Sequence, residues 1–174
     1  MDGLKWLATA SAALLAAGLA APLLAGDLPP IALTTQLGYL EARPDMFRSP
    51  NDAVRAASPN GYFAVSGDFD GDGRTDEARI LIKKNGKEGM MVAVIDRGHN
   101  IKTYGFEKMK ATMLGNIGIK LAPAGTYTLA TPQGGVTTKT IGRDAIMMFR
   151  FGGAARLYTW SDDDFVSVDV VQPG

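Results

Sequence analysis

The residues in this sequence most able to do chemistry are four aspartates between positions 68 and 76, arranged around two glycines. Asp68, Asp70, Asp72 and Asp76 occupy the first, third, fifth and ninth positions of this run. Ca²⁺ takes about six to eight oxygen ligands, and carboxylates spaced in this way can converge on one ion when the chain curls around it. The run therefore predicts a calcium-binding loop.

Two further residues of the run fit this prediction. Gly73 lies at the sixth position, where a sharp turn needs a residue without a Cβ atom. Arg74 lies at the seventh position, where the backbone carbonyl group is the expected ligand and the side chain points to water. The alternative is an acidic turn exposed to solvent, because Asp and Gly both favour turns.

The flanking residues predict that the loop joins two strands. A helix-loop-helix calcium site needs a bidentate Glu at the twelfth position, and this sequence has Arg79 there. Residues 78–82 form a short β-branched apolar run that is typical of a buried strand, and residues 62–65 have the same character. Phe69 is then expected to point from the loop into the core.

The loop also carries a family resemblance. Residues 67–73, followed by Asp76 and a strand, resemble the calcium loop of FG-GAP and VCBS repeats, as in integrin propeller blades. Those proteins build a propeller from many copies, and this chain has one copy, so no propeller is implied. The chain also resembles small exported proteobacterial proteins of uncharacterised function, which carry one such loop, a segment like residues 117–127 and an aromatic hairpin like residues 157–160. This resemblance spans roughly residues 57–170 and implies export and calcium binding, without an established activity.

The first 25 residues are typical of a secretory signal. A positively charged start precedes an uncharged, alanine-rich run over residues 6–21, which Pro22 interrupts, and the segment ends at Ala25. We expect cleavage after Ala25 and a periplasmic or secreted location. The alternative is an uncleaved membrane anchor, because residues 6–25 are about long enough to span a bilayer.

Composition narrows the range of functions. The 174 residues contain no cysteine, which excludes zinc fingers, iron–sulfur clusters and thiol catalysis. The 18 acidic and 18 basic residues balance, so charge gives no argument for binding nucleic acid or an anionic membrane surface. Any membrane contact is expected only through the N-terminal segment, if it stays uncleaved.

The pattern of apolar residues and turns predicts a mainly β fold, as an antiparallel sheet, sandwich or small barrel. Residues 26–50 are expected to form a lead-in, and residues 51–174 a single β domain. One short N-terminal helix is expected to begin near Pro50 with Ser49 as its N-cap, and residues 108–115 are ambiguous. The predicted strands cover residues 62–65, 78–83, 89–95, 101–106, 125–129, 136–141, 145–151, 155–160 and 165–171.

Three other features of the sequence are candidate sites. His99, the sole histidine, lies in a turn where exposure is expected and no catalytic partner is evident. Residues 162–164 are three consecutive aspartates, which suit a polar hairpin turn better than a second cation site. Tyr158 and Trp160 share one strand face, where packing is favoured over a platform for stacking carbohydrate.

These observations favour an exported, non-catalytic β domain in which calcium has a structural role, with an envelope protein or glycan as its partner. One alternative is a metal-dependent hydrolase of the cell envelope that uses the same aspartates. Another is a periplasmic inhibitor or binding module. No arrangement of residues typical of a catalytic site is visible in the sequence.

Overall fold

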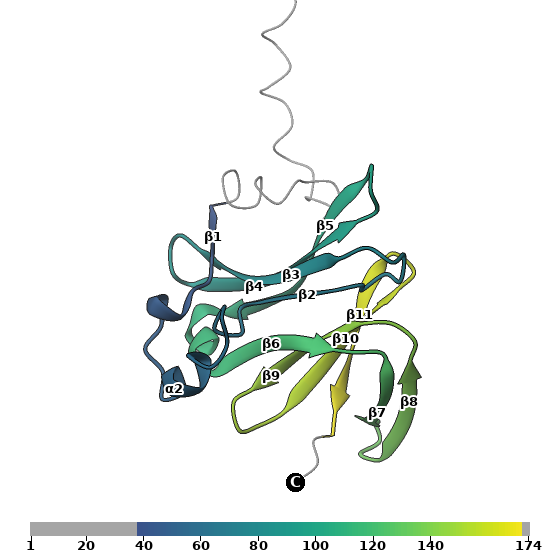
Figure 1. Cartoon of the computed structure of the whole chain (residues 1–174). Helices are drawn as coiled ribbons and strands as arrows, with labels where there is room; N and C mark the ends of the chain where they lie inside the picture. Colours follow the sequence, from purple (N-terminus) through teal and green to yellow (C-terminus); the bar gives the residue numbers. More distant parts are fainter. Residues whose placement is uncertain (1–37, 172–174) are drawn as a thin grey trace, which may run out of the picture.

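The computed structural model describes residues 38–171, and Figure 1 shows them as two layers of β-strands. Within this range the prediction of a mainly β fold is confirmed, because eleven strands form two sheets with antiparallel neighbours. The predicted leader lies outside the described residues. No helix in the described part of the chain combines the length and apolar character needed to cross a membrane.

The first sheet has five strands, in the order β1-β3-β4-β5, with β2 also paired to β3. Since β4 occupies one edge of β3, β1 and β2 share the other edge, one after the other along it. A turn that contains Asn85 and Gly86 connects β3 to β4. The strands are β1 (Tyr39–Glu41), β2 (Ala64–Gly67), β3 (Asp76–Lys83), β4 (Glu88–Asp96) and β5 (Ile101–Lys110).

The second sheet has six strands, in the order β6-β9-β10-β11-β7-β8. A single residue pair, Val170 with Leu129, joins β11 to β7, so the β7–β8 hairpin is free to bend away from the other strands. Apolar side chains of this hairpin pack on the outer face of β9 and β10, as a second, smaller core. The strands are β6 (Ile117–Ala122), β7 (Gly125–Ala130), β8 (Val136–Ile141), β9 (Ala145–Arg150), β10 (Ala155–Ser161) and β11 (Asp164–Val170).

Helical structure is limited to short segments. The predicted N-terminal helix is α2 (Asp52–Arg55), and the ambiguous segment, residues 108–115, covers the end of β5 and most of the 3₁₀ helix η2 (Ala111–Asn116). A second 3₁₀ helix, η1 (Pro44–Met46), lies between β1 and α2. The prediction that Ser49 caps α2 is wrong: the N-cap residue is Asn51, because the Ser49 hydroxyl bonds to the η2 carbonyl group of Gly115.

The main core lies between the two sheets. Because side chains alternate along a strand, Ile80 and Met91 point inward from the five-stranded sheet. Ile119 and Trp160 meet them from the six-stranded sheet. Phe69 is fully buried in the same core, which confirms that the loop after β2 directs this ring inward. Burial of such apolar side chains provides the main favourable free energy of folding.

Tyr158 and Trp160 belong to this inter-sheet core. Both rings are buried, and Trp160 makes an edge-to-face contact with Tyr104 of the opposite sheet. The Tyr158 hydroxyl donates a hydrogen bond to Glu107, 2.9 Å away. Their role is therefore packing, and neither ring is available as a platform for carbohydrate.

The buried side chain of Arg55 connects two short helices to the six-stranded sheet through hydrogen bonds. The Arg55 guanidinium donates hydrogen bonds to the backbone carbonyl groups of Gly61, Leu114 and Ile117. It also lies over the Phe63 ring, with its central carbon 4.4 Å from the ring centroid. Burial lowers the pKa of Arg55. These contacts hold α2, η2 and the start of β6 together.

Candidate metal site

The aspartate-rich loop connects β2 to β3 at the end of their ladder. The last pair of that ladder is Gly67 with Asp76, so the intervening residues must reverse the chain between two adjacent strands. Gly71 and Gly73 have φ values of +82° and +86°. This left-handed conformation favours glycine, which explains why both positions lack a side chain.

Three of the four aspartates meet in space. Asp68, Asp70 and Asp76 each place one carboxylate oxygen within 4.8 Å of the others. Asp76 is only 1% exposed, and the side chain of Asp70 is 3% exposed. Carboxylate oxygens gathered in this way suit a hard cation such as Ca²⁺, since the ion would offset both their mutual repulsion and their loss of water.

Asp72 and Arg74 are placed differently. The Asp72 carboxylate accepts a hydrogen bond from the Arg74 amide, 2.8 Å away, and lies outside the group of three. It is exposed, and its own amide donates to Asp70 Oδ1 at 3.2 Å. The Arg74 guanidinium lies against the turn at Gly98, where an added Cβ would be 3.1 Å from Arg74 Nη2.

Backbone amides fix the orientation of the carboxylates. Asp68 Oδ1 and Oδ2 accept hydrogen bonds from the amides of Gly71 at 2.8 Å and Gly73 at 3.0 Å. Asp76 Oδ2 accepts from the Phe69 amide at 2.8 Å, and Oδ1 accepts from the Asp96 amide of β4 at 2.9 Å. Each carboxylate oxygen can accept more than one bond, so these contacts leave capacity for an ion.

The electrostatics of Asp76 follow from its position. Burial raises the pKa of its carboxyl group, and the neighbouring Asp70 carboxylate raises this pKa further. Hydrogen bonds from the amides of Asp96, Phe69 and Asp70 act in the opposite direction, but the net pKa shift is upward. A bound cation would favour the ionised form of Asp76 and thereby lower its pKa.

Two arginines that sequence reasoning did not identify contact the loop. Arg97, in the turn between β4 and β5, donates from Nε to Asp70 Oδ2 at 2.8 Å and from Nη2 to Asp163 Oδ1 at 2.7 Å. These two bonds raise the pKa of Arg97, which stays charged. Arg143 donates from Nη1 to the backbone carbonyl oxygen of Asp70 at 2.6 Å. Both arginines are remote from the loop in sequence, so spacing gave no signal for them.

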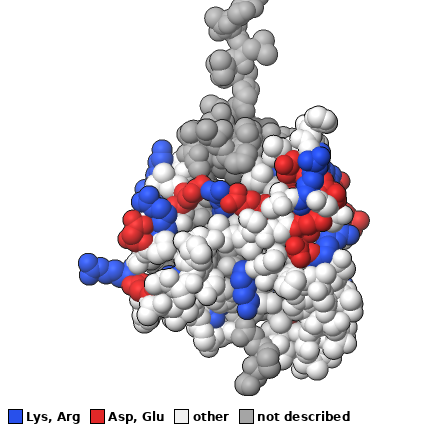
Figure 2. Space-filling view, viewed as in Figure 1, with Lys and Arg blue, Asp and Glu red and all other residues white. Residues whose placement is uncertain are grey.

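These contacts bring turns from the six-stranded sheet to the loop. The amide of Asp68 donates to Asp144 Oδ2 at 3.1 Å, and Asp144 and Arg143 lie in the turn between β8 and β9. Asp163 lies in the turn between β10 and β11. Figure 2 shows acidic and basic side chains gathered at this end of the five-stranded sheet, beside a largely uncharged surface lower in the view. The loop therefore lies where the two sheets meet.

The other candidate residues do not join this group. His99 is exposed in the turn between β4 and β5. The three consecutive aspartates form the hairpin turn between β10 and β11, where Asp162 and Asp163 have φ values of +51° and +61°. Within residues 38–171, the loop trio is the one acidic cluster close enough to hold a metal ion.

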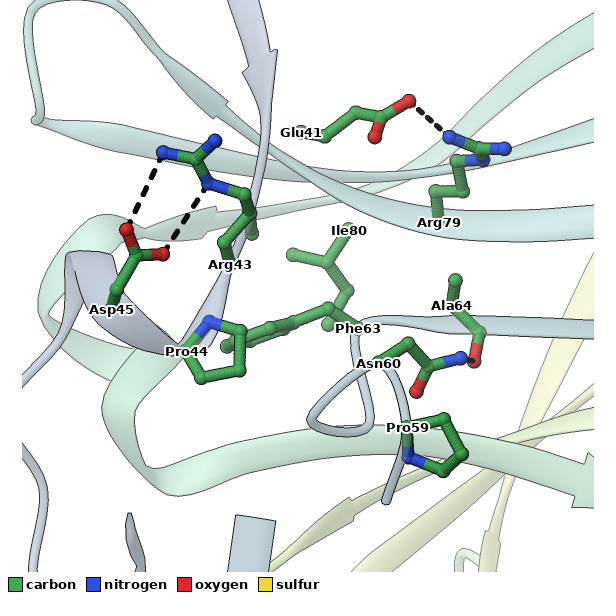
Figure 3. A pocket seen from close by; sticks show the side chains of 11 residues that line it. Glu41, Arg43, Pro44, Asp45, Pro59, Asn60, Phe63, Ala64, Arg79 and Ile80 are labelled. Atoms are coloured by element: carbon green, nitrogen blue, oxygen red, sulfur yellow. Dashed lines mark hydrogen bonds and ion pairs between the residues drawn. The ribbon is translucent and has the colours of Figure 1, made fainter. Parts of the chain in front are cut away.

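A cavity of about 300 Å³ lies at the opposite end of the β2–β3 ladder. Figure 3 shows Phe63 and Ile80 at its apolar centre, with the ion pairs of Arg43 with Asp45 and Arg79 with Glu41 at its rim. The pair Ala64–Arg79 borders the cavity, whereas the loop begins three pairs further along. The cavity is thus separate from the aspartate trio, and both of its guanidinium groups are paired.

Comparison of the chain with protein-family models, curated proteins and solved structures gave no match. The likeness of residues 67–76 to FG-GAP and VCBS loops therefore stays an expectation based on the loop residues alone. The geometry and charge of this site are the features that indicate its function.

Proposed function

We propose that this chain is an exported calcium-binding β domain in which the ion has a structural, non-catalytic role. The observation that carries this proposal is the meeting of oxygens from Asp68, Asp70 and Asp76 within 4.8 Å of one another, with Asp76 buried and the other two residues partly buried. A hard divalent cation with flexible coordination fits such a group of oxygens. Water and backbone carbonyl groups, including the carbonyl of Arg74, would complete its coordination.

The position of the trio explains how an ion would stabilise the fold. Asp76 begins β3 and accepts a hydrogen bond from the Asp96 amide at the end of β4. The loop also binds Asp144 and Arg143 in the turn between β8 and β9. An ion held by the loop would therefore strengthen contacts within the first sheet and between the two sheets.

The expected stabilisation is modest but useful. Extracellular calcium modules bind with dissociation constants of about 10⁻⁴–10⁻³ M. At about 1 mM free Ca²⁺ and the tighter constant, binding adds about 1.4 kcal/mol to the free energy of unfolding. For a domain of this size, that corresponds to a rise in melting temperature of about 3–6 °C.

Export and the partner are the second part of the proposal. The leader at residues 1–25 supports delivery to the periplasm or the outside of the cell. Millimolar calcium is more plausible there than in the cytoplasm, which agrees with a weak site. We expect the partner to be an envelope protein or a glycan, and no contact among the described residues favours the hydrolase alternative.

The direct experiment is a calcium titration by isothermal calorimetry, paired with melting curves in calcium and in chelator. Asp70→Asn removes one charge from the trio while keeping the shape of the side chain. Asp163→Asn is the matched control, because it removes the other carboxylate bound to Arg97 and lies outside the trio. We expect Asp70→Asn to weaken calcium binding at least about tenfold and Asp163→Asn to retain it.

Two results would contradict the proposal. One is a chain whose melting temperature is the same in calcium and in chelator. The other is equal loss of calcium binding in Asp70→Asn and Asp163→Asn, because the site would then not depend on the trio.

A further inference from the structure

The cavity at Phe63 lies where the edge of β3 passes from one partner strand to the other. The change occurs at Ile80, whose carbonyl oxygen accepts a hydrogen bond from the Ala42 amide at 3.0 Å and whose amide donates to the Phe63 carbonyl oxygen at 2.8 Å. The chain leaves this edge after Ala42 and returns to it at Phe63, and the cavity of about 300 Å³ opens between the two segments. Its base is apolar, because Phe63 and Ile80 belong to the main core.

The returning segment, residues 59–64, forms one wall of the cavity and has a strained backbone. Gly61 and Tyr62 have φ values of +63° and +62°. Within residues 38–171, Tyr62 is the one non-glycine residue with a positive φ outside the turn between β10 and β11. Gly61 lies so close to Pro44 of the departing segment that an added Cβ would overlap the proline ring. Backbone strain of this kind costs free energy and is concentrated at functional sites, including those that hold ligands.

A buried charge fixes the same wall from inside the protein. The Arg55 side chain is buried, donates to the Gly61 carbonyl oxygen at 2.7 Å and lies over the Phe63 ring. Among the described residues its hydrogen-bond acceptors are neutral carbonyl groups, and its Nε has no partner. Burying a cation whose hydrogen bonds go to neutral groups is costly. The wall is therefore held in place before a ligand arrives, which lowers the free-energy cost of binding.

The rim of the cavity carries both signs of charge, as Figure 3 shows. Arg43 pairs with Asp45 at 3.3 Å, and these side chains are 64% and 70% exposed. Arg79 pairs with Glu41 and also, at 2.7 Å, with Glu77. Exposed ion pairs contribute little to stability, because water competes for the same groups. Arg43 and Glu41 are therefore available to a ligand, and Arg79 keeps Glu77 when Glu41 turns away from it.

We propose that this cavity binds a small zwitterion with an apolar side chain, which is the chemistry of an apolar amino acid. The ligand side chain lies against Phe63 and Ile80, the carboxylate accepts hydrogen bonds from Arg43, and the ammonium group donates to Glu41. A ligand with one charge leaves either Glu41 or Arg43 without a matching group, whereas a zwitterion matches both. Pockets for small molecules measure about 300–1,000 Å³, so this volume suits a ligand at the small end of the range.

The inference is independent of calcium. The cavity and the aspartate trio share no residue and lie at opposite ends of the β2–β3 ladder. Binding of the zwitterion should therefore be the same in calcium and in chelator. Failure of the calcium proposal would leave this inference standing, and the reverse also holds.

Three related compounds test whether both charges are recognised. Phenylpropionate is phenylalanine without the ammonium group, and phenethylamine is phenylalanine without the carboxylate. Each compound is titrated into the full chain while the amide resonances of Ala64 and Ile80 are followed by NMR. We expect phenylalanine to shift both resonances, with a dissociation constant at least about tenfold lower than that of either analogue, since a hydrogen bond between charged groups contributes about this much.

Two substitutions at the rim separate the two charges. Arg43→Gln should weaken the binding of phenylalanine and phenylpropionate about tenfold and leave phenethylamine unchanged. Glu41→Gln should weaken the binding of phenylalanine and phenethylamine by a similar factor and leave phenylpropionate unchanged. A loss of structure alone would affect all three compounds equally, so this crossed pattern identifies the residue that binds each charge.

Filling the cavity tests its location. Ala64 lines the cavity, whereas Ser66, on the same face of β2, does not. Ala64→Leu should abolish the binding of phenylalanine, and the matched control Ser66→Leu should retain it.

Three results would overturn the inference. The first is the absence of any shift at Ala64 and Ile80 up to the solubility limit of phenylalanine. The second is equal affinity for the three compounds, because the rim would then not recognise charge. The third is equal binding of phenylalanine by Ala64→Leu and Ser66→Leu, which would place the ligand elsewhere. If Ala64→Leu does not fold, the crossed pattern of Arg43→Gln and Glu41→Gln decides the question.

Discussion

Asp70 takes part in both the aspartate trio and an ion pair with Arg97. One of its oxygens belongs to the aspartate trio, and Oδ2 accepts a hydrogen bond from Arg97 Nε. The guanidinium therefore neutralises part of the negative charge that would attract a cation. An ion and Arg97 compete for the same carboxylate, and this competition should limit the affinity of the site.

Replacing Arg97 should therefore strengthen calcium binding. We expect Arg97→Gln to lower the dissociation constant for calcium about threefold, because an ion pair whose guanidinium group is partly exposed to water contributes under about 1 kcal/mol. The same change should lower the melting temperature in chelator, since Asp70 and Asp163 lose their partner. Arg156→Gln, whose ion pair with Asp169 is remote from the loop, is the control. Weaker calcium binding in Arg97→Gln would contradict the competition.

The raised pKa of Asp76 predicts how calcium binding depends on pH. A carboxyl group whose pKa is raised by folding favours the fold when protonated, and this contribution is lost as the pH rises through the folded pKa. Calcium needs the ionised form, so its stabilising effect should grow over the same range. We expect calcium to raise the melting temperature more at about pH 7 than at about pH 4. Equal shifts at both pH values would show that Asp76 does not bind the ion.

At the scale of strands, alternation and turn residues predicted most of the two sheets. Strand β6 (Ile117–Ala122) was not predicted, because Gly115, Asn116 and Gly118 together resemble a loop. It is an edge strand in which Gly118 is required by close packing rather than by a turn. Strand β1 was also missed, since its three residues acquire strand structure only by pairing with β3.

This explanation of Gly118 can be tested by substitution. A Cβ added there would lie 2.7 Å from Tyr62 Cβ and 2.8 Å from Phe149 Cζ, which forces neighbouring atoms to move. We expect Gly118→Ala to lower the free energy of unfolding by about 1–3 kcal/mol, measured by urea denaturation. Gly142→Ala is the matched control, because nothing lies within 4 Å of its added Cβ, and it should change stability by under about 1 kcal/mol. Equal effects of the two changes would refute the packing argument.

The candidate site could be predicted only in part, because some of its contacts, like the pairing of β1 with β3, form between residues that are distant in sequence. Asp68, Asp70 and Asp76 lie within one short loop, so their spacing could be seen directly in the sequence. The contacts of that loop with Arg97, Arg143 and Asp144 arise from the folding of distant turns onto it. Neither the spacing nor the composition of the run indicates which turns these will be.

At the scale of the whole molecule, the loop connects the two sheets. It is continuous with β2 and β3, receives a hydrogen bond from β4, and contacts the turn between β8 and β9 of the other sheet. The sheets otherwise meet mainly through apolar packing, with the Tyr158–Glu107 hydrogen bond as a further polar contact, so the polar contacts at this end help to fix their relative position. A bound ion would stabilise the sandwich at the point where its two layers are joined.

A crystal structure determined in the presence of millimolar calcium is the most direct test of this account. It should contain an ion at about 2.3–2.6 Å from carboxylate oxygens of Asp68, Asp70 and Asp76, with its identity established by anomalous scattering. Density for an ion elsewhere on the domain, or a trio that binds only water at saturating calcium, would contradict the central claim.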